Sequence, residues 1–172
     1  MVTRDEATRL LEEQHAQVAD LLGGLDDEAF ARRGTIGGGE WSAKDLALHL
    51  GSWEDFAVET LAQLRRGERP SIEDAFTGDG SGTDRLNEDH VNLQLDVDPH
   101  EARARFQARH RRVVEAIAAT EEAAWAAEYP FDPDDATVGD RIGSLLGSDA
   151  GGFTHAGAHL DELRAYVTST SS

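Results

Sequence analysis

The sequence predicts an all-α protein, a bundle of four helices. In four long segments, apolar residues recur at spacings of three and four. No segment alternates apolar and polar residues as a half-buried strand does, and no internal repeat of solenoid type is present. With 172 residues, 39% of them hydrophobic, the chain is long enough to build its own core. We therefore expect a single domain over residues 1–172.

The first two helices are expected on either side of a glycine-rich turn. The first covers residues 4–25, and the stretch LGGLDDEAF ends its apolar pattern. The second follows GTIGGGEW, with Ser42 as N-cap and Asp45 three residues later, which is close to a capping box. Its apolar stripe runs from Leu46 to Leu64, so the helix has roughly 25 residues and a length of about 37 Å.

A long polar stretch from Glu68 to Pro99 separates the second helix from the third. It is too long for a simple connection within a bundle, and we expect a partly ordered lid that contains some short helix. The third helix is expected from about Glu101 to Ala119.

The fourth helix is expected from about Thr137 to Val167. Glycines inside this segment weaken it, and we expect a kink or an irregular turn before His155. These glycines are Gly147, Gly151, Gly152 and Gly157.

The composition excludes several classes of function. The chain has 34 acidic and 16 basic residues, and its formal net charge of −18 repels nucleic acid and anionic lipid. We therefore expect no nucleic-acid partner and no membrane partner. No apolar run reaches the about 18 residues of a membrane span, and the start MVTRDEATRLLEEQ is unlike a signal peptide, so we expect a cytoplasmic protein. With no cysteine, the chain offers no thiol nucleophile and no thiolate metal ligand.

Three histidines are expected to meet inside the bundle. His49 lies on the apolar stripe of the second helix, and His155 and His159 share a helical face four residues apart. Neutral imidazole binds zinc, nickel or iron, and a three-histidine set leaves a coordination position open. An isolated HxxxH pair is more often hydrogen-bonded histidine than a metal site, and HAGAH lacks the glutamate of a zinc-protease HExxH motif.

The remaining histidines have simpler interpretations. His110 falls on the apolar stripe of the third helix, where it is either a satisfied core histidine or a residue that lines the same cavity. Trp53 is the tryptophan that we expect to reach that cavity. We expect His15 at the boundary of the first helix, and His90 and His100 in the solvated linker.

The stretch GGGEWSAKDLALHLGSWEDFAVETLAQLRRGE resembles the second helix of the DinB-like metal-binding bundles, whose signature is W-S-x-K-D-x-x-x-H-L. THAGAHLDEL resembles their closing HxxxH helix. The resemblance covers nearly the whole chain and implies a four-helix bundle with a long crossover between helices two and three. It implies that His49, His155 and His159 bind one divalent metal, zinc or nickel, with no catalytic residue beyond these ligands. Affinity is expected to fall as pH drops through about 6, because ligation needs neutral imidazoles.

The resemblance also implies a class of activity. Family members with assigned activities include bacillithiol S-transferases and a mycothiol-dependent maleylpyruvate isomerase, so we expect a metal-dependent transferase with a low-molecular-weight thiol as co-substrate and a small electrophile as substrate. It further implies a homodimer. Two alternatives stay open: a hydrolase that uses a metal-bound hydroxide, and a non-enzymatic, stress-related module that binds a metal or another ligand. The colibactin-resistance proteins form a related branch, and the three histidines favour the metal-binding branch.

Overall fold

The computed structural model describes residues 2–76, 81–132 and 134–170, and the regular secondary structure of these residues is helical. They contain three isolated β-bridges and no β-strand, which confirms the all-α prediction. Among the described helices, none combines the length and the apolar character that crossing a membrane requires. The elements in chain order are α1 (Arg4–Gly23), α2 (Asp27–Ala31), α3 (Ala43–Arg65), the 3-10 helix η1 (Ser71–Asp74), α4 (Ser81–Asn92), α5 (Pro99–Ala118), α6 (Glu122–Trp125), α7 (Val138–Leu145), α8 (His155–Ala158) and α9 (Leu160–Thr170).

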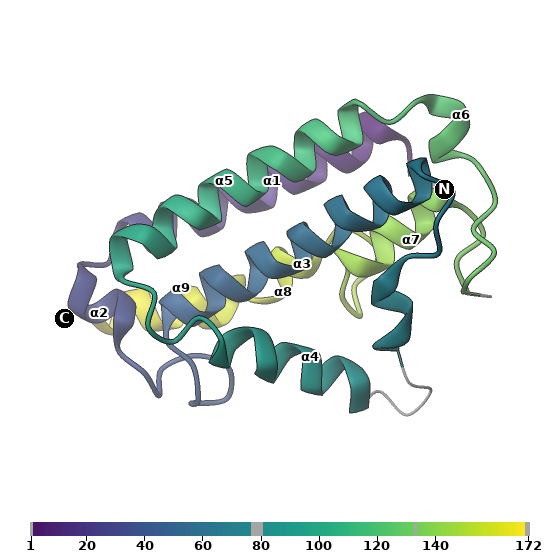
Figure 1. The fold of residues 1–172 in the computed structure, drawn as a ribbon. Coiled ribbons are helices and arrows are strands. Elements are labelled where there is room, and N and C mark those ends of the chain that lie inside the picture. The colour runs from purple at the N-terminus through teal and green to yellow at the C-terminus, as the bar shows by residue number, and fades with distance from the viewer. Residues whose placement is uncertain (1, 77–80, 133, 171–172) are drawn as a thin grey trace.

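The long helices form a four-membered bundle (Figure 1). Helices α3 and α5 pack against each other along much of their length, and α1 packs against α5. The fourth position is filled by α7, α8 and α9 in succession. The crossover between α3 and α5 carries η1 and α4, so the predicted bundle with a long crossover is confirmed.

Helix α3 is the central helix, and its start is fixed by the predicted cap. The Ser42 side chain accepts a hydrogen bond from the Asp45 amide at 3.1 Å, and the Asp45 carboxylate accepts one from the Ser42 amide at 2.9 Å. This reciprocal pair is a capping box with Asp in place of Glu. Every residue from Ala43 to Glu54 is buried, so His49 lies deep within the bundle.

The crossover is tied to the bundle near its carboxyl end. Lys44, the only lysine of the chain, donates from Nζ to the carbonyl oxygens of Leu95 and Val97 at 2.7 and 2.9 Å. These bonds hold the segment before α5 against the start of α3. The expected lid is therefore largely ordered where it is described, while its residues 77–80 lie outside the described residues.

The fourth helix is interrupted before His155, and of the two expected forms, a kink or an irregular turn, the structure has the irregular turn. Helix α7 ends at Leu145, residues 146–154 form an irregular loop, and α8 begins only at His155. A Cβ atom at Gly147 would lie 2.8 Å from two backbone carbonyl oxygens, so the loop folds back on α7 more tightly than any other residue allows. Phe153, at a φ of 61°, turns the chain into α8.

Candidate metal centre

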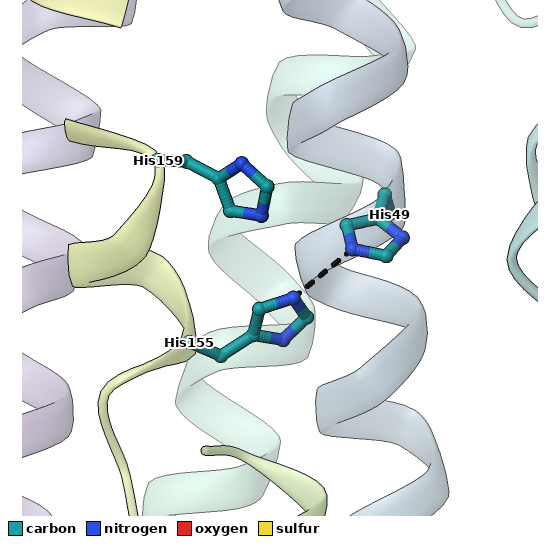
Figure 2. A group of neighbouring side chains, drawn as sticks. All are labelled: His49, His155 and His159. Carbon is teal, nitrogen blue, oxygen red and sulfur yellow. Dashed lines mark hydrogen bonds between the residues drawn. The ribbon is translucent and has the colours of Figure 1, made fainter. Parts of the chain in front are cut away.

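The structure brings the three predicted histidines together (Figure 2). His49 comes from the first third of α3, His155 is the first residue of α8, and His159 lies between α8 and α9. One nitrogen atom from each ring lies within 4.8 Å of the others. The Nε2 atoms of His49 and His155 are 3.0 Å apart. The shared helical face expected for the HxxxH pair is therefore provided by a four-residue helix and its C-cap, not by one long helix.

The donor set fits a divalent transition metal. In a tetrahedral site with zinc–nitrogen bonds of about 2.0–2.1 Å, neighbouring ligand nitrogens lie about 3.3 Å apart. The His49 and His155 nitrogens, at 3.0 Å, are close to that spacing, and the His159 nitrogen lies within 4.8 Å of both. Three protein ligands leave a fourth position for a substrate or water, as in catalytic rather than structural zinc sites.

Burial keeps the three imidazoles neutral. It lowers the pKa of His49 well below the usual value, and the neighbouring His155 and His159 lower it further. Burial, followed by the proximity of His159, lowers the pKa of His155 to about 4, and burial also lowers the pKa of His159. Neutral rings have their lone pairs ready for a metal. We therefore expect protons to compete with the metal at a lower pH than the value of about 6 expected from the sequence.

Gln14 on α1 positions the segment that carries His155. Its side-chain amide donates to the Phe153 carbonyl oxygen at 2.6 Å, and its Oε1 accepts from the Gly157 amide at 2.7 Å. A Cβ atom at residue 157 would lie 2.8 Å from Gln14 Oε1, so a larger residue there would displace the Gln14 amide. The His155 amide also donates to the Leu146 carbonyl oxygen at 3.0 Å. The glycine-rich loop is thus held on both sides of the first ligand of the pair.

Two large pockets reach the histidines. The first, which we call the lid pocket, has a volume of about 340 Å³ and is lined by Trp53, Phe76, Thr83, Asn87, Arg141, Ser144, Leu145, Gly147 and His155. The second, the loop pocket, has a volume of about 690 Å³ and is lined by Gln14, Gly147, Ser148, Asp149, Ala150, Thr154, His155, Gly157, Ala158 and His159. A further hollow of about 520 Å³ beside α6 contains none of the three histidines, and we assign it no role.

Trp53 lies where the sequence places it, at the cavity. Its ring meets that of His155 edge to face at 5.9 Å, and its Nε1 donates to Asn87 Oδ1 on α4 at 3.0 Å. The second tryptophan near the site is Trp41, whose ring lies 4.8 Å from that of His49. Aromatic rings therefore flank two of the three candidate ligands, and the Trp53 ring also binds α4 of the crossover.

His110 lines neither pocket and belongs to a separate polar group in the core. Its ring stacks on that of His15 with centroids 3.7 Å apart, and its Nδ1 lies 2.8 Å from Glu54 Oε1. His15 Nε2 in turn lies 3.1 Å from Gln107 Oε1. Burial raises the pKa of Glu54 to about 8 and lowers the pKa of His110 to about 4, so the pair is neutral at pH 7. Of the two interpretations of His110, the structure agrees with the satisfied core histidine.

Two features of this region were missed at the level of sequence. Glu54 lies on the inward stripe of α3, four residues after Leu50 and three before Ala57, and this spacing is the signal that could have identified it. His90, expected in solvent, is half-buried and meets the Phe56 ring edge to face at 4.7 Å. Burial lowers the pKa of His90 as well. His100 is exposed, as expected.

Comparison with known families agrees with the helical fold. The sequence model of the DinB superfamily matches residues 10–147, which is most of the chain. The chain belongs to the DinB superfamily. The match includes His49 and ends before His155 and His159, so the case for the other two ligands rests on their geometry. No curated protein matches the sequence.

Two solved structures share the fold. An uncharacterised protein from Escherichia coli UTI89 superposes with a TM-score of 0.78 at 16% identity, covering 99% of this chain and 96% of its own. The colibactin self-resistance protein ClbS, solved in complex with a double-stranded DNA, gives a TM-score of 0.75 at 14% identity, covering 100% of this chain and 98% of its own. At such identities the likeness establishes the fold alone.

The ClbS complex corrects one expectation. We expected no nucleic-acid partner because of the net charge of −18, but a protein of the same fold is found on DNA. Net charge describes the field of the whole molecule, whereas DNA contact depends on the local distribution of charge. The charge argument therefore does not exclude nucleic acid for this fold.

Proposed function

We propose that this member of the DinB superfamily binds one zinc or nickel ion through His49, His155 and His159 and transfers a low-molecular-weight thiol to a small electrophile. The observation that carries the proposal is the convergence of three neutral imidazoles, of which His49 is buried, His155 and His159 are half-buried, and His155 lines both pockets. A metal held there lowers the pKa of a bound thiol, so that thiolate is available at neutral pH.

The two pockets suit a reaction with two substrates. The loop pocket contains two of the three proposed ligands, His155 and His159, and suits the thiol. The lid pocket contains His155 together with the apolar walls of Trp53 and Phe76, and suits an electrophile with an apolar body. In the transfer the thiol proton passes to solvent, the new sulfur–carbon bond forms, and the leaving group departs with its bonding electron pair.

The absence of cysteine supports the same chemistry. No thiol of the chain competes for the metal or reacts with the electrophile. All sulfur chemistry therefore comes from the co-substrate, and the chain contributes the ligands and the pockets.

The proposal is tested with protein purified without a histidine tag and reconstituted with zinc or nickel. We expect about one equivalent of metal and metal-dependent transfer of mycothiol, bacillithiol or a surrogate thiol to a chlorinated nitrobenzene. His155→Ala should lose both properties. Turnover with water but without thiol would favour the hydrolase, and bound metal without any turnover would favour the binding module.

DNA binding is a second candidate function, favoured by the ClbS complex. Helix α5 carries five of the 16 basic residues of the chain, which gives one element a locally positive character. Among them Arg111 and Arg112 are exposed, although Arg112 is paired with Asp55 at 3.0 Å. Fluorescence anisotropy with a labelled duplex at low salt tests this candidate. Binding that weakens with salt and with Arg111→Ala would support it, and an unchanged anisotropy at high micromolar protein would reject it.

A further inference from the structure

The polar group of His15, Glu54 and His110 lies close to the three-histidine centre but is not a second metal site. One potential ligand atom from each residue lies within 4.8 Å of the others, as in a metal site. However, the rings of His15 and His110 stack with an angle of only 7° between their planes. Imidazole nitrogens bind a metal through lone pairs in the ring plane, and in stacked rings these point in parallel rather than toward one ion.

The unusual atom in this group is the second carboxyl oxygen of Glu54. Oε1 lies 2.8 Å from His110 Nδ1, whereas Oε2 is buried and makes no hydrogen bond within the described residues. The side chain is only 10% exposed. Buried polar atoms in native proteins are almost always paired with protein or ordered water, so Oε2 calls for a partner.

A small cavity joins Glu54 to the metal centre. Its volume is about 20 Å³, and Glu54, His15 and His155 contribute its polar lining among apolar side chains. This volume holds one water molecule, which requires about 10–15 Å³ and two or more polar partners. The Nε2 atom of His155 faces His49, and its Nδ1 points away from His159 (Figure 2). Nδ1 is therefore the nitrogen through which a water can link His155 to Glu54.

We propose that Glu54 is a positioning residue for His155, linked to it by one water molecule in this cavity. The water accepts a hydrogen bond from His155 Nδ1–H and donates one to Glu54 Oε2. This fixes the tautomer in which the lone pair of His155 Nε2 is directed toward His49 and the metal. Histidine ligands generally donate their second N–H to a carboxylate, a carbonyl or a water, and loss of that partner weakens metal binding by about 10–100-fold.

The inference rests on the proposed metal binding, and its first test is the zinc affinity measured by competition with a chelating dye. Glu54→Met removes both oxygens while keeping the length of the side chain, and we expect about 10–100-fold weaker zinc binding. Glu54→Gln keeps a carbonyl oxygen that can accept from the water, and it should recover most of the affinity. The control is Glu59→Met, the same change at an exposed position of the same helix, which should bind zinc like the wild type.

A second test reads the tautomer of His155 directly in the metal-free protein. In ¹⁵N spectra of the histidine rings, we expect wild-type His155 to be protonated at Nδ1 and Glu54→Met to give a mixture of both tautomers. The proposal is overturned if Glu54→Met leaves both the tautomer and the zinc affinity as in the wild type. If the wild-type protein binds no zinc, the proposed function fails, and the tautomer still decides whether Glu54 orients His155.

Discussion

Replacing Gln14 tests whether one α1 side chain holds in place the segment that carries the proposed ligands His155 and His159. Gln14→Met keeps the length of the side chain and removes its donor and its acceptor. The change leaves the Phe153 carbonyl and the Gly157 amide without the partners that they have at 2.6 and 2.7 Å. Both groups flank His155, so the loss should reach the proposed ligands as well as the stability of the fold.

The magnitude follows from the two hydrogen bonds. Each contributes about 0.5–1.5 kcal/mol net, so the variant should lose about 1–3 kcal/mol of unfolding free energy. For a chain of this size 1 kcal/mol corresponds to about 2–4 °C, and a loss of 2 kcal/mol lowers Tm by about 4–8 °C. Zinc affinity should fall in parallel, because the loop must be ordered again before His155 and His159 can bind.

The assay is thermal unfolding of the metal-free protein, together with zinc competition. The matched control is Gln17→Met, an exposed position on the same helix whose side chain accepts from Arg164 at 3.0 Å. A surface change of this kind is expected to alter stability by no more than about 0.5 kcal/mol. If Gln14→Met melts within 1 °C or so of this control and binds zinc normally, the loop is held by other contacts and the reasoning is wrong.

Three further predictions concern the metal, the pH and the loop. Zinc at about 100 times its Kd should stabilise the protein by about 2.7 kcal/mol, which corresponds to a rise in Tm of about 5–11 °C. His159→Ala should abolish this rise. An equal rise in the variant would contradict the proposed site. The metal-free protein should lose stability as pH falls from about 6.5 towards 4, since the folded state holds the pKa of His155 near 4 while the unfolded chain takes up protons near 6.5. Each such histidine changes the unfolding free energy by about 1.4 kcal/mol per pH unit in this range. Glu54 acts in the opposite direction and offsets one histidine, because its folded-state pKa near 8 makes its stabilising contribution shrink as pH rises from about 4.5 to 8. Urea titrations at pH 7, 5.5 and 4.5 measure the sum of these effects. Gly147→Ala should lower both Tm and zinc affinity, because the new Cβ would lie 2.8 Å from backbone oxygens. The control Gly23→Ala, with open space around it, should leave both unchanged or raise Tm. Equal effects of the two variants would argue against a tight loop.

The central part of the site was predictable because its signals are local. The cap at Ser42 and Asp45 fixes where α3 begins, and the apolar stripe that follows fixes which way His49 faces. Both depend on residues within a few positions of each other. The position of His49 in the core followed from spacing alone, and the family resemblance supplied its expected role.

The geometry around His155 was not predictable, because it depends on contacts across the molecule. The glycines of the fourth segment lower helix propensity, but the break comes from the close approach of Gly147 to other backbone atoms. The bonds from Gln14 join residues 139 and 143 positions apart. Contacts between residues so far apart in the chain produce no periodic pattern in a single sequence.

The charge of the chain gave a wrong expectation for a related reason. The total of −18 is a sum over the surface, and it contains no information about where the 16 basic residues lie. Five of them are on α5. Which partners the charges favour can be judged only when the fold shows where each charged side chain lies.

The break between α7 and α9 has a kinetic consequence. Helix α8 has four residues and none of them is buried, so the segment with His155 and His159 can detach locally while the bundle stays folded. Two of the three proposed ligands then leave together, and His49 alone cannot retain an ion. We therefore expect the residence time of a metal at the proposed site to be set by the opening rate of one short loop, and to be far shorter than the lifetime of the folded state.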